Sequence, residues 1–144
     1  MPAPRTFYLI RQVGNLIRGI IERGLSDLGV TPAQYTLMNW LLAREAVTSA
    51  MLARALHVSP QTMNTLIASL QDQGLVVRRS DTTNKRIRLV SLTEKGRGVV
   101  AACNRVVDGL ENEFFAQLGA TDLVAFRYTL EGLMTGSRRS RSVL

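Results

Sequence analysis

The chain has 144 residues, 46% of them hydrophobic, which is too apolar for a disordered chain and is the length of one domain. Its net charge of +7 suggests a polyanionic partner, either nucleic acid or an anionic membrane surface, but net charge alone fits a basic soluble protein without such a partner equally well. One cysteine excludes an internal disulfide, no apolar run could span a bilayer, and the N-terminus lacks a signal-peptide core, so we expect a cytoplasmic protein.

The first predicted element is an amphipathic helix over about residues 6–26. Its apolar residues recur at steps of three and four, which is the period of a helix with one buried face. Gly29 is expected to end this segment.

Two further helices are predicted between residues 31 and 57. Thr31-Pro32-Ala33-Gln34 has an N-cap residue, a proline at the first helical position and a glutamine that completes a capping box. A short helix follows from about Ser49 to His57, capped by Thr48 or Ser49.

The next helix begins at an equally clear signal. Ser59 is the expected N-cap and Pro60 the first helical residue, while Gly74 is placed to end the helix in the left-handed conformation. The inward face is apolar and consists of Met63, Leu66, Ile67 and Leu70.

After Gly74 the pattern changes from helical to extended. Residues 75–78 and 87–92 are rich in β-branched side chains and flank a polar stretch, which predicts a β-hairpin. Thr93 then caps a helix that runs to about Gln117, and a final helix opens at Thr121. The last residues, 137–144, are expected to form a flexible basic tail.

Two short helices joined by a tight turn and followed by a hairpin make a winged helix-turn-helix. The fold class predicted is therefore mainly α with a small β-hairpin wing. The outward face of the helix after Ser59 carries short uncharged polar side chains, which can bond base edges in a major groove. A merely solvated face usually carries Lys and Glu instead, so we favour the groove interpretation. The outward residues are Gln61, Thr62, Asn64, Thr65, Ala68 and Ser69.

The cationic charge is concentrated on the hairpin. From residue 78 to residue 88 only Asp81 opposes five cations, whereas the last 47 residues hold five cations and five anions. A wing with this charge could contact the DNA backbone or the minor groove. The alternative is a charged hairpin tip that contacts only solvent, and we favour contact with DNA. The five cations are Arg78, Arg79, Lys85, Arg86 and Arg88.

The motifs of this region resemble the MarR (multiple antibiotic resistance regulator) family. The matching residues are Leu52-Ala53-Arg54-Ala55-Leu56-His57-Val58-Ser59, Leu70-x-x-x-Gly74-Leu75-Val76-x-Arg78 and Asn84-x-Arg86-x-x-x-Val90-x-Leu92-Thr93-x-x-Gly96. The last is similar to the family's wing signature, D-x-R-x-x-x-V-x-L-T-x-x-G. Asn84 replaces the usual Asp, and Thr65 stands where many relatives carry Arg, so base readout is expected to depend on Gln61, Thr62 and Asn64.

The resemblance implies one domain over residues 1–144, with the DNA-binding region at about 32–96. It implies dimerisation helices at about 6–28 and 97–136, and hence an obligate homodimer on a palindromic site. Both terminal segments carry more apolar residues than a small DNA-binding core needs, which agrees with a role in dimerisation. The interface candidates, for which a role in the intrachain core is the alternative, are Leu9, Val13, Phe114, Phe126, Leu130 and Leu133.

The resemblance also implies a response to small aromatic or lipophilic effectors, or to oxidants. The candidates for a ligand pocket are Tyr35, Met38 and Trp40, although a core role is favoured for them. Peroxide sensors of the family carry a reactive cysteine in the first helix. Cys103 lies in a later helix and is therefore expected to be a core or interface residue.

The function predicted is a sequence-specific regulator of transcription, acting as a ligand-responsive repressor on duplex DNA. The alternative is a nonspecific architectural or protein-interaction module on the same fold. No enzyme activity, metal site or cofactor is expected, because the chain has one His, one Cys and no phosphate-binding loop. The predicted DNA-binding residues are Thr48, Ser59, Pro60, Gln61, Thr62, Asn64, Thr65, Ser69, Arg78, Lys85 and Arg86.

Overall fold

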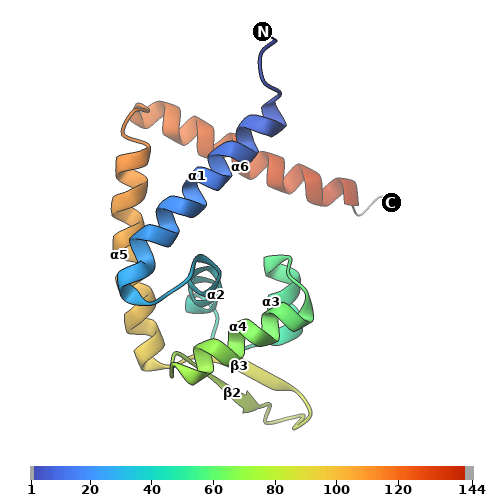
Figure 1. The fold of residues 1–144 in the computed structure, drawn as a ribbon. Helices are drawn as coiled ribbons and strands as arrows, with labels where there is room; N and C mark the ends of the chain where they lie inside the picture. The colour runs from blue at the N-terminus through green and yellow to red at the C-terminus, as the bar shows by residue number, and fades with distance from the viewer. Residues whose placement is uncertain (1, 142–144) are drawn as a thin grey trace. The chain divides into compact units, whose positions relative to one another are not determined.

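The computed structural model describes residues 2–141, with the side chains of residues 2–136. Figure 1 shows the order of the elements along the chain. The helices are α1 (Thr6–Leu25), the short 3-10 helix η1 (Ser26–Leu28), α2 (Pro32–Leu42), α3 (Ser49–Leu56), α4 (Pro60–Asp72), α5 (Glu94–Phe114) and α6 (Ala120–Arg141). The strands are β1 (Val47–Thr48), β2 (Val76–Ser80) and β3 (Arg88–Leu92).

The chain forms two compact units, Met1–Asp108 and Gly109–Leu144. Helix α5 begins in the first unit and ends in the second. The division into units therefore does not conflict with a single domain over residues 1–144. That domain and its DNA-binding and dimerisation regions stay predictions. None of the helices within residues 2–141 is long and apolar enough to cross a membrane.

The first unit contains the predicted helix-turn-helix and wing. Its sheet has the order β1-β3-β2, and both pairings are antiparallel. Helix α4 packs against α3 and against β2, as Figure 1 shows in green beside the hairpin. The core joins α2, α3 and α4 to the sheet, and its fully buried members include Leu37, Leu41, Leu52, Met63, Ile67, Leu70, Val90 and Val100. This is the predicted fold class, a mainly helical protein with a small β wing.

The helix boundaries follow local chemistry. Thr31 and Gln34 form the predicted capping box at α2, with both reciprocal hydrogen bonds present. Thr48 Oγ1 accepts the N–H of Met51 and so caps α3, which settles the choice left open between Thr48 and Ser49. Gly74 ends the segment after α4 with φ +73°, a left-handed conformation that glycine adopts without steric cost.

Several elements differ from the sequence prediction. The strand β1 was not predicted, because two residues carry too little pattern, and Val47 pairs with Val90 of β3. Strands β2 and β3 begin one residue later than expected, and α5 ends at Phe114 rather than near Gln117. Helix α6 continues to Arg141, beyond the boundary expected at residue 136, and residues 142–144 of the predicted tail lie outside the described residues.

Candidate nucleic-acid interface

Helix α4 has one apolar face and one polar face. Met63, Ile67 and Leu70 have no exposed surface and anchor the helix to the core. Gln61, Thr62, Asn64 and Thr65 are exposed on the outward side. The helix is therefore fixed to the unit by packing while its uncharged hydrogen-bonding groups remain open to a partner.

The turn that orients α4 is short and closely hydrogen-bonded. His57 ends α3 in the left-handed conformation, with φ 55°, and the N–H of Val58 donates to the carbonyl of Ala53 at 3.1 Å. Ser59 Oγ then accepts the N–H of Thr62 at 3.1 Å, and Pro60 supplies the preset φ of the first helical turn. The chain reverses over three residues, so α3 and α4 form a helix-turn-helix.

Hydroxyl groups at the N-terminal end of α4 form hydrogen bonds within the helix itself. Ser59 Oγ donates to Thr62 Oγ1 at 2.9 Å, and Thr65 Oγ1 donates to the carbonyl of Gln61 at 3.0 Å. These bonds fix the rotamers of the two threonines, while Gln61, Thr62 and Thr65 all remain exposed. Such groups can meet thymine methyls and the base edges of adenine.

Ser69 lies differently from the other predicted base-contacting residues. Its side chain is half-buried, and its Oγ accepts a hydrogen bond at 2.9 Å from Nε2 of Gln34, a residue of α2. Gln34 is recognisable in the sequence as a capping-box residue, but its second contact, with Ser69, is not. A pair separated by 35 residues leaves no local signal that could have revealed it.

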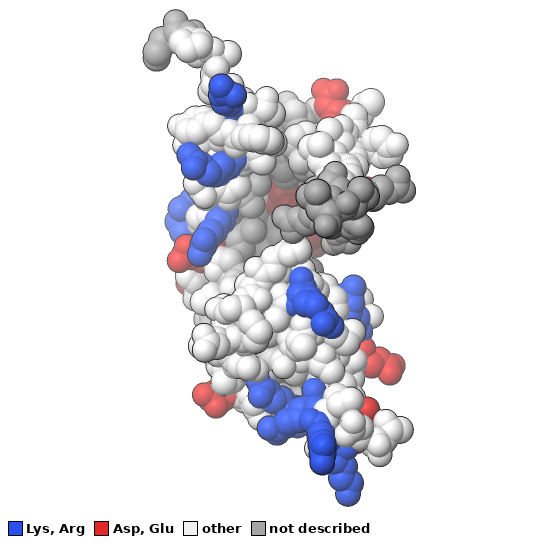
Figure 2. Space-filling model, turned by 90° about the vertical axis from the view of Figure 1, so that its right-hand side faces the viewer, with Lys and Arg blue, Asp and Glu red and all other residues white. Residues whose placement is uncertain are grey.

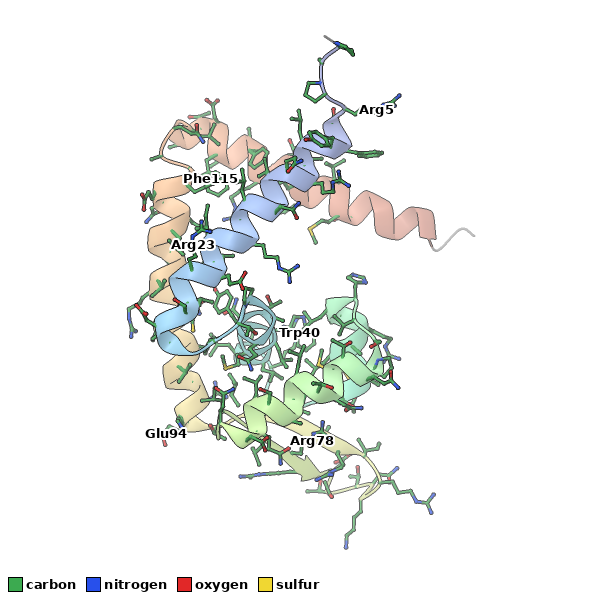
Figure 3. The ribbon with its side chains drawn as sticks, in the orientation of Figure 1. Arg5, Arg23, Trp40, Arg78, Glu94 and Phe115 are labelled. Atoms are coloured by element: carbon green, nitrogen blue, oxygen red, sulfur yellow. The ribbon has the colours of Figure 1, made fainter. Side chains whose placement is uncertain are left out.

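Arg78 connects the wing to α4. Its Nη2 donates to Oδ1 of Asn64 at 3.3 Å, and its Nε is buried without a hydrogen-bond partner among the described residues. In Figure 3 its side chain lies where the hairpin meets α4. The residue therefore orients a side chain of α4, in addition to contributing charge.

The wing tip is shaped by two short side chains. Asp81 accepts both the N–H and the hydroxyl of Thr83, and Asn84 Oδ1 accepts the N–H of Arg86 at 3.1 Å. Asn84, which replaces the usual Asp at this position, thus closes the turn through a hydrogen bond to the backbone. Lys85 and Arg86 are thereby held at the exposed end of the hairpin.

Figure 2 shows Lys and Arg side chains gathered at the lower end of this face, where Figure 1 places the hairpin. Arg79 and Arg88 are also exposed and add to the charge of Lys85 and Arg86. Thr48, in contrast, is half-buried and holds the N-terminus of α3, which is its observed role.

The candidate interface residues of the termini are largely exposed. On α1, Leu9 and Val13 expose 47% and 38% of their surface. On α6 the exposed apolar residues include Phe126, Leu130 and Leu133. Phe114 is half-buried and meets Phe115 edge to face at 4.9 Å between ring centroids. An open pocket of about 370 Å³ lies on the second unit, and its apolar lining includes Phe115 (Figure 3), Leu123, Phe126 and Leu130.

The three candidate pocket residues have separate environments. Tyr35 donates its hydroxyl to Oδ1 of Asn104 at 2.6 Å, and Met38 is fully buried in the core. The guanidinium of Arg44 lies 3.5 Å from the centroid of the half-buried Trp40 ring and forms a cation–π contact with it. No group of three His, Cys, Asp or Glu side chains that could hold a metal ion occurs in the described part of the chain.

Cys103 is buried in the core of the first unit, and desolvation raises the pKa of its thiol. A buried thiol of raised pKa is a poor nucleophile, because the reactive form is the thiolate.

The chain is similar to known proteins in both sequence and three-dimensional structure. Residues 28–87 match the family model described as MarR family. The HTH-type transcriptional repressor Rv2887 of Mycobacterium tuberculosis is 32% identical over 126 residues, which cover 88% of this chain and 91% of that protein. The crystal structure of the M. tuberculosis MarR family protein Rv2887 in complex with DNA is similar with a TM-score of 0.78, covering 92% of this chain and 98% of that one.

A second solved structure, CouR from Rhodococcus jostii RHA1 bound to p-coumaroyl-CoA, has a TM-score of 0.78 at 25% identity. The similarity covers 88% of this chain and 89% of CouR. The sequence of Rv2887 and its three-dimensional structure match most of this chain, and the family model matches residues 28–87 within it. The chain therefore belongs to the MarR family of winged helix-turn-helix transcription regulators.

Proposed function

We propose that this protein is a cytoplasmic homodimeric repressor that binds a palindromic operator in duplex DNA. The observation that carries the proposal is the exposed, uncharged polar face of α4 next to the cationic β2–β3 wing. Helix α4 enters the major groove and reads bases, and the wing cations contact phosphates. The 32% identity to the repressor Rv2887, whose structure has been solved in complex with DNA, supports this assignment.

The bare apolar surface of the terminal helices supports a second copy as partner. Phe7 is 88% exposed on α1, and Leu133 is 60% exposed on α6. On each of these helices, large exposed apolar side chains are typical of an interface that is covered in the assembled protein. Two copies related by a two-fold axis place two recognition helices in successive major grooves, which requires a palindromic site.

The dimer is tested with two variants of α6. Leu133→Asp adds a charge to the proposed interface, whereas Val124→Asp adds the same charge nine residues earlier, on the opposite side of the helix. Both residues are well exposed, so neither change removes a core contact. Light scattering with size-exclusion chromatography should give a dimer for the native protein and Val124→Asp, and a shift toward monomer for Leu133→Asp. A native monomer at micromolar concentration would contradict the proposal.

DNA binding is tested by anisotropy titrations on intergenic fragments over a range of salt concentrations. If about three cations of each subunit contact phosphates, the log–log slope for a dimer is roughly −5. A salt-independent interaction would contradict the proposal, and equal recovery of all genomic fragments in a selection would favour an architectural role over a regulatory one.

The division of labour between wing and helix is tested with single variants. Arg86→Ala should weaken binding to all sequences and reduce the magnitude of the slope, whereas Gln61→Ala should reduce preference at particular bases. Arg105→Ala removes an exposed cation of α5, away from the wing, and serves as the charge-matched control. Equal loss on all sequences from Arg86→Ala and Gln61→Ala would refute this division.

We further propose that an aromatic acid or its thioester releases the operator. The support is the similarity to CouR, which was crystallised with p-coumaroyl-CoA. Trp40 is the only tryptophan of the chain, so its emission reports on its surroundings without substitution. Titration with aromatic acids should change this emission and lower operator affinity over the same concentration range. Operator affinity that no tested aromatic compound lowers would count against this part of the proposal.

A further inference from the structure

Gln34 is the only buried residue with a polar side chain among the described residues, and 6% of its surface is exposed. A buried amide is costly unless its donor and acceptor groups find partners. Its Oε1 accepts the N–H of Thr31 at 3.1 Å, and its Nε2 donates to Oγ of Ser69 at 2.9 Å. The side chain therefore connects the first turn of α2 to the third turn of α4.

This contact differs in kind from the packing around it. The faces of Met63, Ile67 and Leu70 are apolar, and apolar contacts do not fix a direction. A hydrogen bond has a preferred length and angle, so the Gln34–Ser69 bond selects one rotation of α4 about its axis. The capping box in turn fixes Gln34 relative to Thr31, so the reference point is the N-terminus of α2.

Small rotations matter at the DNA surface. Side-chain tips lie about 6 Å from a helix axis, so a rotation of about 10° moves them by roughly 1 Å. A hydrogen bond to a base edge that is lengthened by about 1 Å falls outside the bonding range. The rotation of α4 about its axis therefore determines whether Gln61 and Asn64 reach the correct base.

We propose that Ser69 and Gln34 form a positioning pair that sets the rotation of α4, and that Ser69 does not itself contact DNA. This inference rests on the proposed operator binding and assigns Ser69 a role different from the one its sequence position indicates. The pair determines discrimination between operators, and the wing cations supply the nonspecific part of the affinity.

The test is a double-mutant cycle on the full-length protein. Ser69→Ala removes the acceptor, and Gln34→Met removes the amide while keeping the length of the side chain. The measured quantity is the ratio of Kd values for an operator with one altered base in the half-site and for the native operator. Each single variant should lower this ratio roughly two- to tenfold, the value of one hydrogen bond, and the double variant should lower it no further.

Two further variants separate positioning from contact. Ser69→Thr keeps the hydroxyl group and should restore discrimination, and Gln71→Ala, on an exposed neighbour in the same turn, should leave it unchanged. The salt dependence of binding should be the same in all variants, because no phosphate contact is removed. These variants also keep the test decisive if Gln34→Met fails to fold.

Three results would overturn the inference. An effect of Ser69→Ala that persists undiminished in the Gln34→Met background would mean that Ser69 does not act through Gln34, since its Oγ also lies 3.5 Å from Nε2 of Gln73. A smaller salt slope for Ser69→Ala would mean that Ser69 contacts DNA. Discrimination unchanged in both single variants would mean that the bond does not position the helix. A native protein without sequence preference would overturn the proposed function itself, and this outcome is visible before any variant is made.

Discussion

Gly96, in the first turn of α5, is predicted to be a residue that the fold cannot exchange for alanine. A Cβ atom at this position would overlap the carbonyl oxygen of Leu75 and would lie 3.2 Å from Cδ2 of Leu92. The Leu75 carbonyl cannot withdraw freely, because it accepts the N–H of Thr93 at 3.1 Å. Thr93 Oγ1 also donates to the carbonyl of Gly74, so the root of the wing is tied to the start of α5.

The expected cost of Gly96→Ala follows from these contacts. Overfilling a packed site costs about 1–3 kcal/mol, and the upper half applies because the obstructing atom is backbone. Loss of the Thr93–Leu75 hydrogen bond adds about 1 kcal/mol, and the higher helix propensity of alanine returns about the same amount. We therefore expect a net loss of about 2–3 kcal/mol in the free energy of unfolding, or a Tm lower by about 4–12 °C.

Gly98 provides a matched control on the same helix. A Cβ atom there meets no heavy atom within 4 Å, so Gly98→Ala should gain helix propensity and stabilise the protein by about 0.5–1 kcal/mol. The assay is urea unfolding monitored by circular dichroism at one protein concentration, because dimerisation makes apparent stability depend on concentration. Changes of the same sign for both variants would refute the reasoning from the close approach of Gly96 to Leu75.

Three other predictions concern the thiol, the turn and the wing. Because burial raises the pKa of the Cys103 thiol, a disulfide reagent should label it far more slowly in the native protein than in urea, with a rate that rises with pH; rapid native labelling would contradict a core role. His57→Gly should stabilise the protein by about 0.5–1 kcal/mol because glycine adopts the observed φ of 55° without steric cost, whereas His57→Val should destabilise it; thermal unfolding gives both signs. Asn84→Asp keeps the acceptor for the N–H of Arg86 but adds a negative charge beside the wing cations, so anisotropy should show weaker operator binding at low salt and unfolding should show unchanged stability.

The sequence predicted those parts of the fold that depend on residues close together along the chain. Caps such as Thr31, Ser59 and Gly74 act on residues within one turn, so their positions are readable from residue types alone. The strand β1 was missed because its two residues are extended only through pairing with β3, whose partner residues Val90 and Leu89 lie more than forty positions further along the chain. Local pattern carries no information about such a partner.

The candidate interface shows the same limit at the level of side chains. The exposed positions of α4, such as Gln61 and Asn64, followed from helical periodicity and the buried face opposite them. Ser69 is also a polar residue that periodicity places on the outward side, yet it is half-buried and its hydroxyl accepts a hydrogen bond from Gln34 of another helix. Periodicity gives the side of a helix on which a residue lies, and only the tertiary structure gives its hydrogen-bond partner.

The separation of the two faces of α4 has an evolutionary consequence. Met63, Ile67 and Leu70 hold the helix in the core, while the exposed residues add nothing to that core and can be exchanged at little cost in stability. After a gene duplication, one copy can therefore acquire a new target site through a few codon changes on the exposed face, while every intermediate remains folded. Gln34 and Ser69 are the positions at which such divergence should be slowest, since a change in either one alone removes the hydrogen bond that joins α2 to α4.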